Sequence, residues 1–450
     1  RTDLSVSEWA QHLREELMDE KIVIIGNGIA GSTLAIQLAE KGAASVTLIS
    51  DESSYFFSRT ALMYVYMGHL TKEQLEPVSR ESWAQSPIQR VKARVLSIRP
   101  EDKELSFQSS DRHVKQLSYD RLVIATGSKP AFYDWKGLEA EGVLGLYHLS
   151  DLEKLEKWAP NASACPEAVV IGGGLIGVEL CEMLLSRQIK TTLIIRENFF
   201  WSSHLPESDA KFVERHIQSH HLNLIKEDEL LEISANQTGR VSSIQTKKGE
   251  TISCNLVGIT TGVRPNIEFL KTSQLELDKG ILVDEYLKTS DPSIYAIGDC
   301  AQLRNPLSNR SAIEPVWYTG KMMGETLAQT FSGEPTPYNP GIWYNSAKFF
   351  DLEYQTYGKV HPKALQPESE QHFHWETDER AMTFAYDKSS RAFLGINTFG
   401  IRLNHRIVSS WIETTTNIKE VIDRLEEVHF DPEFSHRYYK QIKHAFVQNH

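Results

Sequence analysis

Residues 21–31 read KIVIIGNGIAG, and residues 168–177 read AVVIGGGLIG. Each stretch is a short apolar run followed by a glycine turn of the pattern GxGxxG, and each continues into a helical segment and a second apolar run. A strand, a glycine turn, a helix and a second strand form the βαβ unit that binds dinucleotides. Because the pattern occurs twice with the same flanks, we predict two dinucleotide-binding domains in this chain.

The glycines of such a turn have separate physical roles. The first permits the tight turn, the second lets a pyrophosphate approach the backbone, and the third allows the helix to pack closely on the strand. The predicted nucleotide contacts are Gly26, Gly28, Ala30 and Gly31 in the first turn and Gly172, Gly174, Ile176 and Gly177 in the second.

The residue after the second strand of each unit indicates which nucleotide is bound. In the first unit this residue is Asp51, whose carboxylate can accept hydrogen bonds from a ribose. In the second unit it is Arg196, which suits a 2′-phosphate. The adjacent Glu197 could hold a free ribose after a small change of register. The pattern favours NADPH over NADH and leaves both open.

Three further motifs resemble a known superfamily. Residues 289–299 read TSDPSIYAIGD, which resembles the flavin-binding motif of the pyridine nucleotide-disulfide oxidoreductases. Residues 125–130 (ATGSKP) and 261–266 (TGVRPN) resemble the crossover motifs between the FAD and NAD domains of that superfamily. The resemblance covers nearly all of residues 21–335. It implies FAD and NAD(P)H as cofactors, with Asp299 accepting hydrogen bonds from the ribityl chain of FAD.

Residues 48–62, LISDESSYFFSRTAL, are similar to the ferredoxin-reductase-like branch, which includes putidaredoxin reductase, rubredoxin reductase, dioxygenase ferredoxin reductases and apoptosis-inducing factor. Residues 314–317 (EPVW) and 343–358 resemble the helix near the isoalloxazine and the start of the C-terminal interface domain in that branch. The resemblance decays after Gly358. The further cofactor contacts that it implies are Arg59, Val95, Ala125, Thr126, Gly127, Gly262 and Val316.

The resemblance also implies three residues near the flavin, Tyr64, Glu179 and Trp317. Tyr64 stands where branch members often carry a lysine near flavin N5, so the positive charge that favours anionic reduced flavin is absent. For Glu179 the alternative to a place near the flavin or nicotinamide is an ordinary helix-surface residue. For Trp317 the alternative is a residue packed in the core. We predict no catalytic acid or base, because hydride passes between the cofactors themselves.

Cysteine usage argues against thiol chemistry. The four cysteines form no CxxC or CxxxxC pair, and residues 53–68, which the resemblance places beside the flavin, contain none. A disulfide reductase needs two cysteines that can pair against the flavin. We therefore interpret Cys165, Cys181, Cys254 and Cys300 as core residues and predict a reducing cytoplasm.

The three histidines His216, His220 and His221 have a spacing that also occurs in metal sites. Because no cysteine and no paired carboxylates accompany them, we interpret them as a helix surface and predict no metal site.

Composition excludes several other classes. The net charge of −12 disfavours a nucleic-acid-binding surface. No segment approaches the roughly 18 to 20 apolar residues that a membrane-spanning helix needs. The first 21 residues contain acidic side chains and no apolar centre, so we do not expect a signal peptide there.

The predicted fold class is α/β, with two Rossmann-like domains and a C-terminal α+β domain. We predict an N-terminal helical extension (1–20), a discontinuous FAD domain (21–145 and 270–335), an NAD(P) domain (146–269) and the C-terminal domain (336–450).

The predicted function is electron transfer from NAD(P)H through FAD to a small electron-carrier protein of the ferredoxin or rubredoxin type. Two alternatives stay open: an NAD(P)H oxidase or quinone reductase, and a redox-sensing flavoprotein like apoptosis-inducing factor. An oligomer is possible from the sequence.

Overall fold

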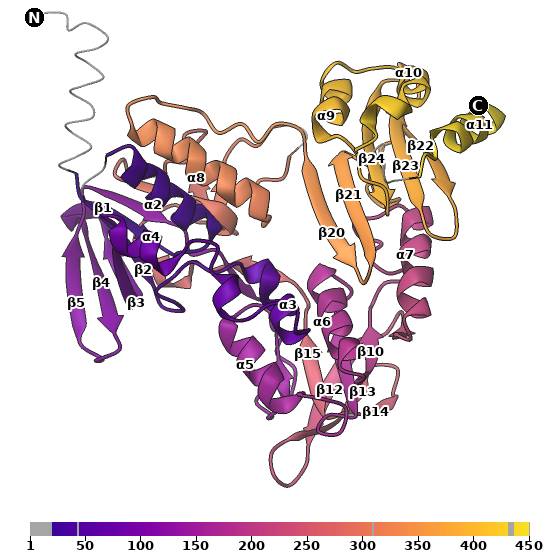
Figure 1. Ribbon diagram of the computed structural model, residues 1–450. Helices are drawn as coiled ribbons and strands as arrows, with labels where there is room; N and C mark the ends of the chain where they lie inside the picture. Colours follow the sequence, from indigo (N-terminus) through magenta and orange to yellow (C-terminus); the bar gives the residue numbers. More distant parts are fainter. Residues whose placement is uncertain (1–19, 43–44, 308–309, 431–435, 450) are drawn as a thin grey trace, which may run out of the picture. The chain divides into compact units, whose positions relative to one another are not determined.

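A computed structural model of the protein describes residues 20–42, 45–307, 310–430 and 436–449 (Figure 1). The predicted N-terminal helix lies outside these residues. The chain forms two compact units. The first unit runs to Ala131 and adds Tyr147–Leu149 and Val263–Pro340, and the second contains Phe132–Leu146, Ser150–Gly262 and Gly341–His450. The predicted domain boundaries, which divide the chain more finely, stay predictions.

The first unit is built on a seven-stranded sheet in the order β18-β6-β1-β2-β3-β4-β5. The strands from β18 to β3 are parallel, and β3, β4 and β5 form an antiparallel ladder. Strand β1, with the sequence IVII, is buried at every position, as expected for a parallel strand covered on both faces. The strands are β1 Ile22–Ile25, β2 Val46–Ser50, β3 Gln89–Arg99, β4 Glu104–Ser109, β5 Val114–Ser118, β6 Arg121–Ile124 and β18 Ile294–Ala296.

Two helices of the first unit, α2 (Ile29–Glu40) and α8 (Trp317–Phe331), pack side by side (Figure 1). Helix α2 buries Ala30, Leu34 and Leu38, which recur at helical spacing on one face. The two helices come close because α8 carries Gly324, where a Cβ atom would lie 2.6 Å from the backbone oxygen of Ala30. The shorter helices are α3 Leu62–Tyr66 and α4 Arg80–Gln85.

A small ladder in the first unit marks where the chain leaves this unit and where it returns. Strand β7 (Ser128–Pro130) pairs antiparallel with β16 (Val263–Pro265), with Pro130 opposite Val263. Lys129 of β7 also forms an ion pair with Glu268. A second pair of short strands, β17 Ile281–Val283 and β19 Ala301–Leu303, is parallel.

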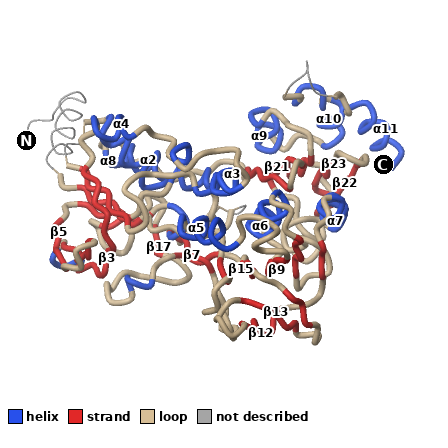
Figure 2. The backbone as a smooth tube through the Cα atoms, turned by 60° about the horizontal axis from the view of Figure 1, so that its bottom comes forward, coloured by secondary structure: helices blue, strands red, loops and turns tan. Residues whose placement is uncertain are grey.

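The second unit contains a five-stranded parallel sheet in the order β11-β10-β9-β15-β8, beside helix α6 (Figure 2). The three-stranded antiparallel sheet β12-β13-β14 follows β11 along the chain. The strands are β8 Val143–Leu144, β9 Glu167–Ile171, β10 Lys190–Ile194, β11 Asn223–Ile225, β12 Leu230–Ala235, β13 Val241–Thr246, β14 Thr251–Ser253 and β15 Leu256–Ile259, and the helices are α5 Leu149–Trp158, α6 Leu175–Ser186 and α7 Glu207–Ser219.

The last part of the second unit is a five-stranded antiparallel sheet, β20-β21-β24-β23-β22, with three helices. Strands β23 and β24 are consecutive along the chain and pair as an antiparallel hairpin. The strands are β20 Tyr344–Phe349, β21 Leu352–Gly358, β22 Glu370–Glu376, β23 Ala381–Asp387 and β24 Phe393–Phe399, and the helices are α9 His405–Glu413, α10 Ile418–Asp423 and α11 Tyr439–Asn449. The predicted α/β class with a C-terminal α+β part is confirmed.

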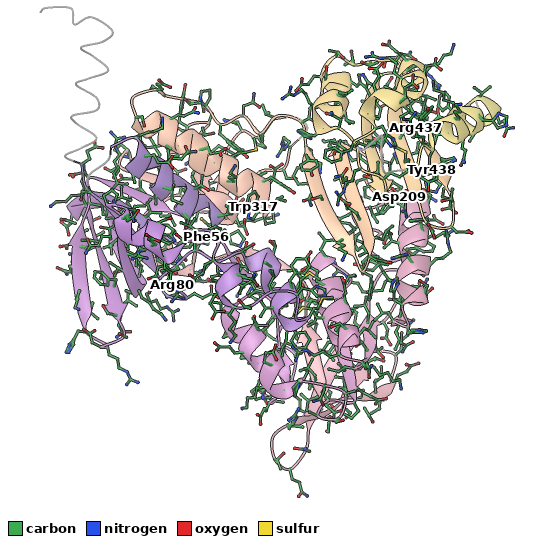
Figure 3. All side chains as sticks on the ribbon, viewed as in Figure 1. Phe56, Arg80, Asp209, Trp317, Arg437 and Tyr438 are labelled. Atoms are coloured by element: carbon green, nitrogen blue, oxygen red, sulfur yellow. The ribbon has the colours of Figure 1, made fainter. Side chains whose placement is uncertain are left out.

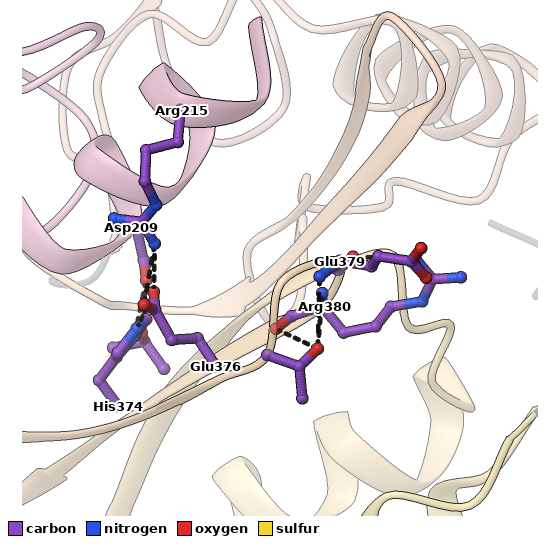
Figure 4. A network of polar contacts seen from close by, with 8 residues as sticks. Asp209, Arg215, His374, Glu376, Glu379 and Arg380 are labelled. Atoms are coloured by element: carbon purple, nitrogen blue, oxygen red, sulfur yellow. Dashed lines mark hydrogen bonds and ion pairs between the residues drawn. The ribbon is translucent and has the colours of Figure 1, made fainter. Parts of the chain in front are cut away.

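Polar contacts attach α7 to this antiparallel sheet (Figure 4). Asp209 of α7 is fully buried and accepts hydrogen bonds from Thr383 and, at 2.8 Å, from Asn397. Arg215, two turns further along α7, donates to both carboxylate oxygens of Glu376. In the described part of the chain, no helix combines the length and apolar character that crossing a membrane requires.

Candidate functional site

The first glycine turn joins β1 to α2, and its outer glycines are required sterically. Gly26 has φ +107°, and a Cβ there would lie 2.1 Å from the carbonyl oxygen of Ala125. A Cβ on Gly31 would lie 2.0 Å from the carbonyl oxygen of Gly26. At Gly28, by contrast, no atom of the described chain lies within 4 Å of the Cβ position. The turn is therefore packed at both ends and open in the middle, where a phosphate would have to approach.

The second glycine turn repeats this arrangement between β9 and α6. Gly172 has φ +113°, with its Cβ position 2.6 Å from the carbonyl oxygen of Thr260, and the Cβ position of Gly177 lies 2.1 Å from the carbonyl oxygen of Gly172. The Cβ position of Gly174 again has no described atom within 4 Å. The same steric pattern in two unrelated stretches of sequence supports the same use, the binding of a pyrophosphate.

Both helices that follow these turns begin without a capping side chain. The N-cap residues are Gly28 for α2 and Gly174 for α6, and among the described residues no side chain makes the cap hydrogen bond. The first backbone N–H groups of a helix need an acceptor, and together with the helix dipole they favour an anion. Each helix start can thus bind a phosphate.

Asp299 lies against the first of these helix starts. It follows Gly298, whose φ of +75° and Cβ position 3.1 Å from the Cβ of Ala30 bring the turn onto α2. Ser128 Oγ donates a hydrogen bond to Asp299 Oδ2 at 2.9 Å. Burial raises the pKa of the Asp299 carboxyl, although Ser128 and Arg59 act in the opposite direction. The structure therefore brings the predicted residues Ala30 and Asp299 together, and it adds Ser128, which sequence reasoning missed.

Arg59 forms an ion pair with Glu52, the residue next to the predicted ribose acceptor Asp51. Its guanidinium donates to Glu52 at 2.8 Å and to the carbonyl oxygen of Tyr147, and it lies 4.3 Å from the centre of the Tyr147 ring. Burial would raise the pKa of Glu52, but hydrogen bonds from His148, Arg59 and the backbone of Leu149 lower it to about 2.

Asp51 lies directly after β2 and is exposed, so its carboxylate is accessible to a ribose. In the sequence, only its position next to Asp51 indicates that Glu52 belongs to the site. No feature of the sequence indicates this for Tyr147.

Helix α8 begins beside the same region. Val316 is its N-cap and Trp317 its first residue, and the indole is 39% exposed (Figure 3). This exposure disfavours the core-packing alternative for Trp317. Thr319 Oγ1 donates to the carbonyl oxygens of Glu314 and Val316 at 2.9 Å each, which fixes the helix start.

Other predicted contacts of the first unit have partners within the protein. Thr126 Oγ1 donates to the carbonyl oxygen of Asn266 at 2.8 Å, and Gly127 has φ +64°. Tyr64 is half-buried in α3, with its ring 6.1 Å from that of His69. Val95 is buried in the core on the antiparallel part of β3, so its side chain packs inside the unit and only its backbone is left for a nucleotide.

In the second unit, Arg196 and Glu197 lie beyond the end of β10. Arg196 is 71% exposed, and its Nε lies 3.1 Å from Glu197 Oε1. Ile176 and Glu179 are half-buried in the first turns of α6, and Gly262 has φ +104° after β15. Burial and the nearby charge of Glu182 raise the pKa of the Glu179 carboxyl to about 7.

All four cysteines are free and buried. Burial raises the pKa of each thiol, to about 11 for Cys165 and Cys300 and to about 12 for Cys254. Cys300, next to Asp299, has its Sγ 3.4 Å from the carbonyl oxygens of Ile124 and Ile297. Because the thiolate is the reactive form, these thiols are poor nucleophiles.

Two parallel-sheet βαβ units with uncapped glycine turns, one of them beside the half-buried Asp299, form the arrangement expected of a protein that binds two dinucleotides. Comparison with known proteins agrees. The family model described as "Pyridine nucleotide-disulphide oxidoreductase" matches residues 20–323. The chain belongs to this family.

Individual relatives are more distant. The rubredoxin-NAD(+) reductase of Pseudomonas putida is 26% identical over 329 residues, which cover 72% of this chain and 83% of the relative. The assimilatory nitrate reductase electron transfer subunit of Bacillus subtilis is 24% identical over 345 residues, 76% of this chain but only 43% of the relative.

Among solved structures, the covalent putidaredoxin reductase–putidaredoxin complex contains a chain with a TM-score of 0.77 and 21% identity, with 88% of this chain and 93% of that chain covered. At this identity the likeness concerns the fold.

These findings confirm the predicted recognition and the predicted enzyme class, an FAD-dependent NAD(P)H oxidoreductase. The individual site residues stay predictions.

Proposed function

We propose that this protein is an FAD-dependent NAD(P)H reductase that delivers electrons to a small electron-carrier protein of the ferredoxin or rubredoxin type. The observation that carries the proposal is the duplicated glycine turn, open only at Gly28 and Gly174, with Asp299 beside the first copy. The relationship to a rubredoxin reductase supports the choice of acceptor. The four free cysteines support a reducing, cytoplasmic location.

The protein's part in this reaction is binding and orientation. The N–H groups at the start of α2 bind the pyrophosphate of FAD, and Asp299 and Arg59 hold the rest of that cofactor. The start of α6 binds the pyrophosphate of NAD(P)H. The chemistry that bound FAD would supply is the acceptance of hydride from NAD(P)H and one-electron reduction of the carrier.

The two alternatives are separated by steady-state rates of the FAD-loaded protein. We expect fast NAD(P)H oxidation with ferricyanide and with a rubredoxin-type or ferredoxin-type carrier, and slow oxidation with oxygen alone. Fast turnover with oxygen or a small quinone and none with the carriers would identify an oxidase or quinone reductase. Slow turnover with every acceptor would identify a redox sensor.

Removing all four cysteines is expected to leave electron transfer intact. The thiols are buried with raised pKa values, so a variant with alanine or serine at each should keep NAD(P)H-to-ferricyanide turnover within about threefold, near 0.65 kcal/mol of barrier. FAD content is measured in parallel, because Cys300 adjoins the FAD region. A variant with full FAD, normal flavin reduction and collapsed acceptor reduction would return the protein to the thiol-using reductases.

Exchanging Arg196 for glutamate is expected to shift nucleotide choice. If the exposed guanidinium contacts a 2′-phosphate, Arg196→Glu should move the ratio of kcat/KM values toward NADH by at least about tenfold, or 1.4 kcal/mol. Lys190→Glu is the matched control, since Lys190 carries the same charge at the opposite end of β10. An unchanged ratio would assign the ribose to Glu197 or another residue.

Glu179 is expected to give the enzyme a pH dependence near neutrality. Its pKa of about 7 lies above the ordinary 4.5, so the folded protein binds more protons than the unfolded chain between these values. The stability contributed by the protonated carboxyl is full below about 4.5 and is lost as pH rises through about 7.

Glu179→Gln should therefore flatten the fall of the unfolding midpoint with rising pH and remove an inflection near pH 7 from kcat/KM for NAD(P)H. Glu250→Gln, at an exposed site, should change neither. The assignment fails if the inflection persists in Glu179→Gln.

A further inference from the structure

The C-terminal end of helix α7 and the tip of the β20–β21 hairpin bring two histidines and an aspartate together in the second unit. His216 lies in the last turn of α7, and His220 is the C-cap of that helix. Asp351 belongs to the two-residue hairpin turn, where the preceding Phe350 has φ +57° and stacks on the His220 ring at 4.7 Å. One possible ligand atom from each of the three lies within 4.8 Å of the others.

The two imidazole rings direct the same atom at one carboxylate oxygen. Asp351 Oδ1 lies 2.8 Å from His216 Nε2 and 3.2 Å from His220 Nε2. Ligands held tetrahedrally at about 2.0 to 2.2 Å from a zinc ion stand roughly 3.3 to 3.6 Å apart. The His220 contact is close to that separation, and the His216 contact would lengthen by about half an ångström around an ion.

The other ring nitrogen of His220 is already engaged by the backbone. His220 Nδ1 lies 3.0 Å from the carbonyl oxygen of His216. His216 lies near the backbone of Phe349, and its Nε2 is the ring atom that faces Asp351. The bond of His220 to a carbonyl places its ring proton on Nδ1 and leaves the Nε2 lone pair to face the ligand, the arrangement usual for metal-binding histidines.

A divalent cation between the two Nε2 atoms and the carboxylate would satisfy all three groups at once. A shared proton would lie close to the line that joins nitrogen and oxygen. A metal ion lies off that line, which fits the close but unaligned contact of His216 Nε2 with Asp351.

A further carboxylate, that of Glu182, lies close to the His216–His220–Asp351 cluster. Glu182 of α6 is buried and accepts a hydrogen bond from the backbone of Phe350, and its carboxylate lies near His220 and Asp351. Its Oε2 atom has no hydrogen-bond partner among the described residues, and its nearest cation, Lys348, is 3.8 Å away. The negative charge of this side chain therefore also favours a cation at the cluster.

We propose that His216, His220 and Asp351 form a binding site for a divalent transition-metal ion, with Zn²⁺ the best match to two imidazoles and one carboxylate. The ion ties α7 to the β20–β21 hairpin, with a fourth position open to water. The proposal revises the sequence-based prediction of no metal site, in which these histidines lacked an accompanying carboxylate. Asp351 is far from them along the chain, and only the hairpin brings it to the helix. It is independent of the proposed reductase function.

The test uses the full-length, FAD-loaded protein, stripped with a chelator and titrated with Zn²⁺ by calorimetry and with Co²⁺ by visible absorption. We expect one Zn²⁺ per chain and tetrahedral Co²⁺ bands. Asp351→Asn and His220→Ala should weaken binding by at least about 100-fold. Asp351 is 76% exposed, so its replacement should leave the fold intact.

His221→Ala is the matched control, because this neighbouring histidine is exposed and outside the cluster. It should keep wild-type affinity. Zn²⁺ at about 100 times its Kd should also raise the unfolding midpoint by roughly 5 °C in the wild type and not in Asp351→Asn. The proposal is overturned if the wild type binds no stoichiometric ion, or if Asp351→Asn and His220→Ala bind as tightly as His221→Ala.

Discussion

Asp299→Ala is expected to be purified without its yellow colour. The half-buried Asp299 carboxylate is the acceptor beside the first glycine turn, and its removal takes away a charge-assisted hydrogen bond worth about 1.5 to 3 kcal/mol. That range corresponds to roughly 10- to 150-fold weaker binding of FAD. NAD(P)H-to-ferricyanide activity should fall with FAD content, measured by flavin absorbance after denaturation.

The fold of this variant should survive. Because burial raises the pKa of Asp299, the charged carboxyl is disfavoured until a ligand binds it, and its loss should not lower the unfolding midpoint of the FAD-free protein. Asp299→Asn, which keeps one acceptor oxygen, should retain more FAD than Asp299→Ala. Full FAD occupancy in Asp299→Ala would falsify the assignment.

Arg310→Met is expected to be among the most destabilising single changes in the first unit. The side chains of Arg310 and Glu314 are only 2% and 7% exposed and are joined by two hydrogen bonds of 2.7 and 2.5 Å. Removing one partner leaves an uncompensated buried charge, which costs about 3 to 5 kcal/mol. The free energy of unfolding from urea titration measures this cost.

The double variant Arg310→Met/Glu314→Gln should recover much of the loss, because no buried charge is left unpaired. Lys321→Met provides the control: its ion pair with Glu325 is exposed on α8 and contributes about 0.2 to 1 kcal/mol. Equal costs for Arg310→Met and Lys321→Met would contradict the prediction. Since Glu314 precedes Val316 and Trp317, Arg310→Met should also loosen the start of α8.

The sequence was sufficient for the parts of this molecule that depend on local chemistry. The glycine turns, the apolar strands that precede them and the α/β class follow from side-chain size and periodicity within about 30 residues. The geometry at Gly26 and Gly31 shows why, since each position excludes a Cβ atom.

The sequence was insufficient where partners come from distant parts of the chain. Ser128 and Tyr147 reach Asp299 and Arg59 only through the crossing of loops, and Asp351 reaches His216 only through a hairpin. The sequence analysis named Asp51 as a cofactor contact and did not name Glu52. The sequence does not distinguish the roles of two adjacent carboxylates, whereas the structure shows that Glu52 binds Arg59. Val95 was predicted from resemblance, which carries no information on which way a strand residue faces.

The ladder of β7 and β16 makes the chain modular. Pro130 and Val263 are opposite each other in that ladder, so the part of the second unit that lies between them in the sequence leaves and rejoins the first unit at adjacent points. Within residues 132–262, only residues 147–149 belong to the first unit. A segment whose two ends lie next to each other can be exchanged with little change to the rest of the fold. An exchange of this segment would have to keep residues 147–149, because the carbonyl oxygen of Tyr147 and the N–H of Leu149 bind Arg59 and Glu52 of the first unit.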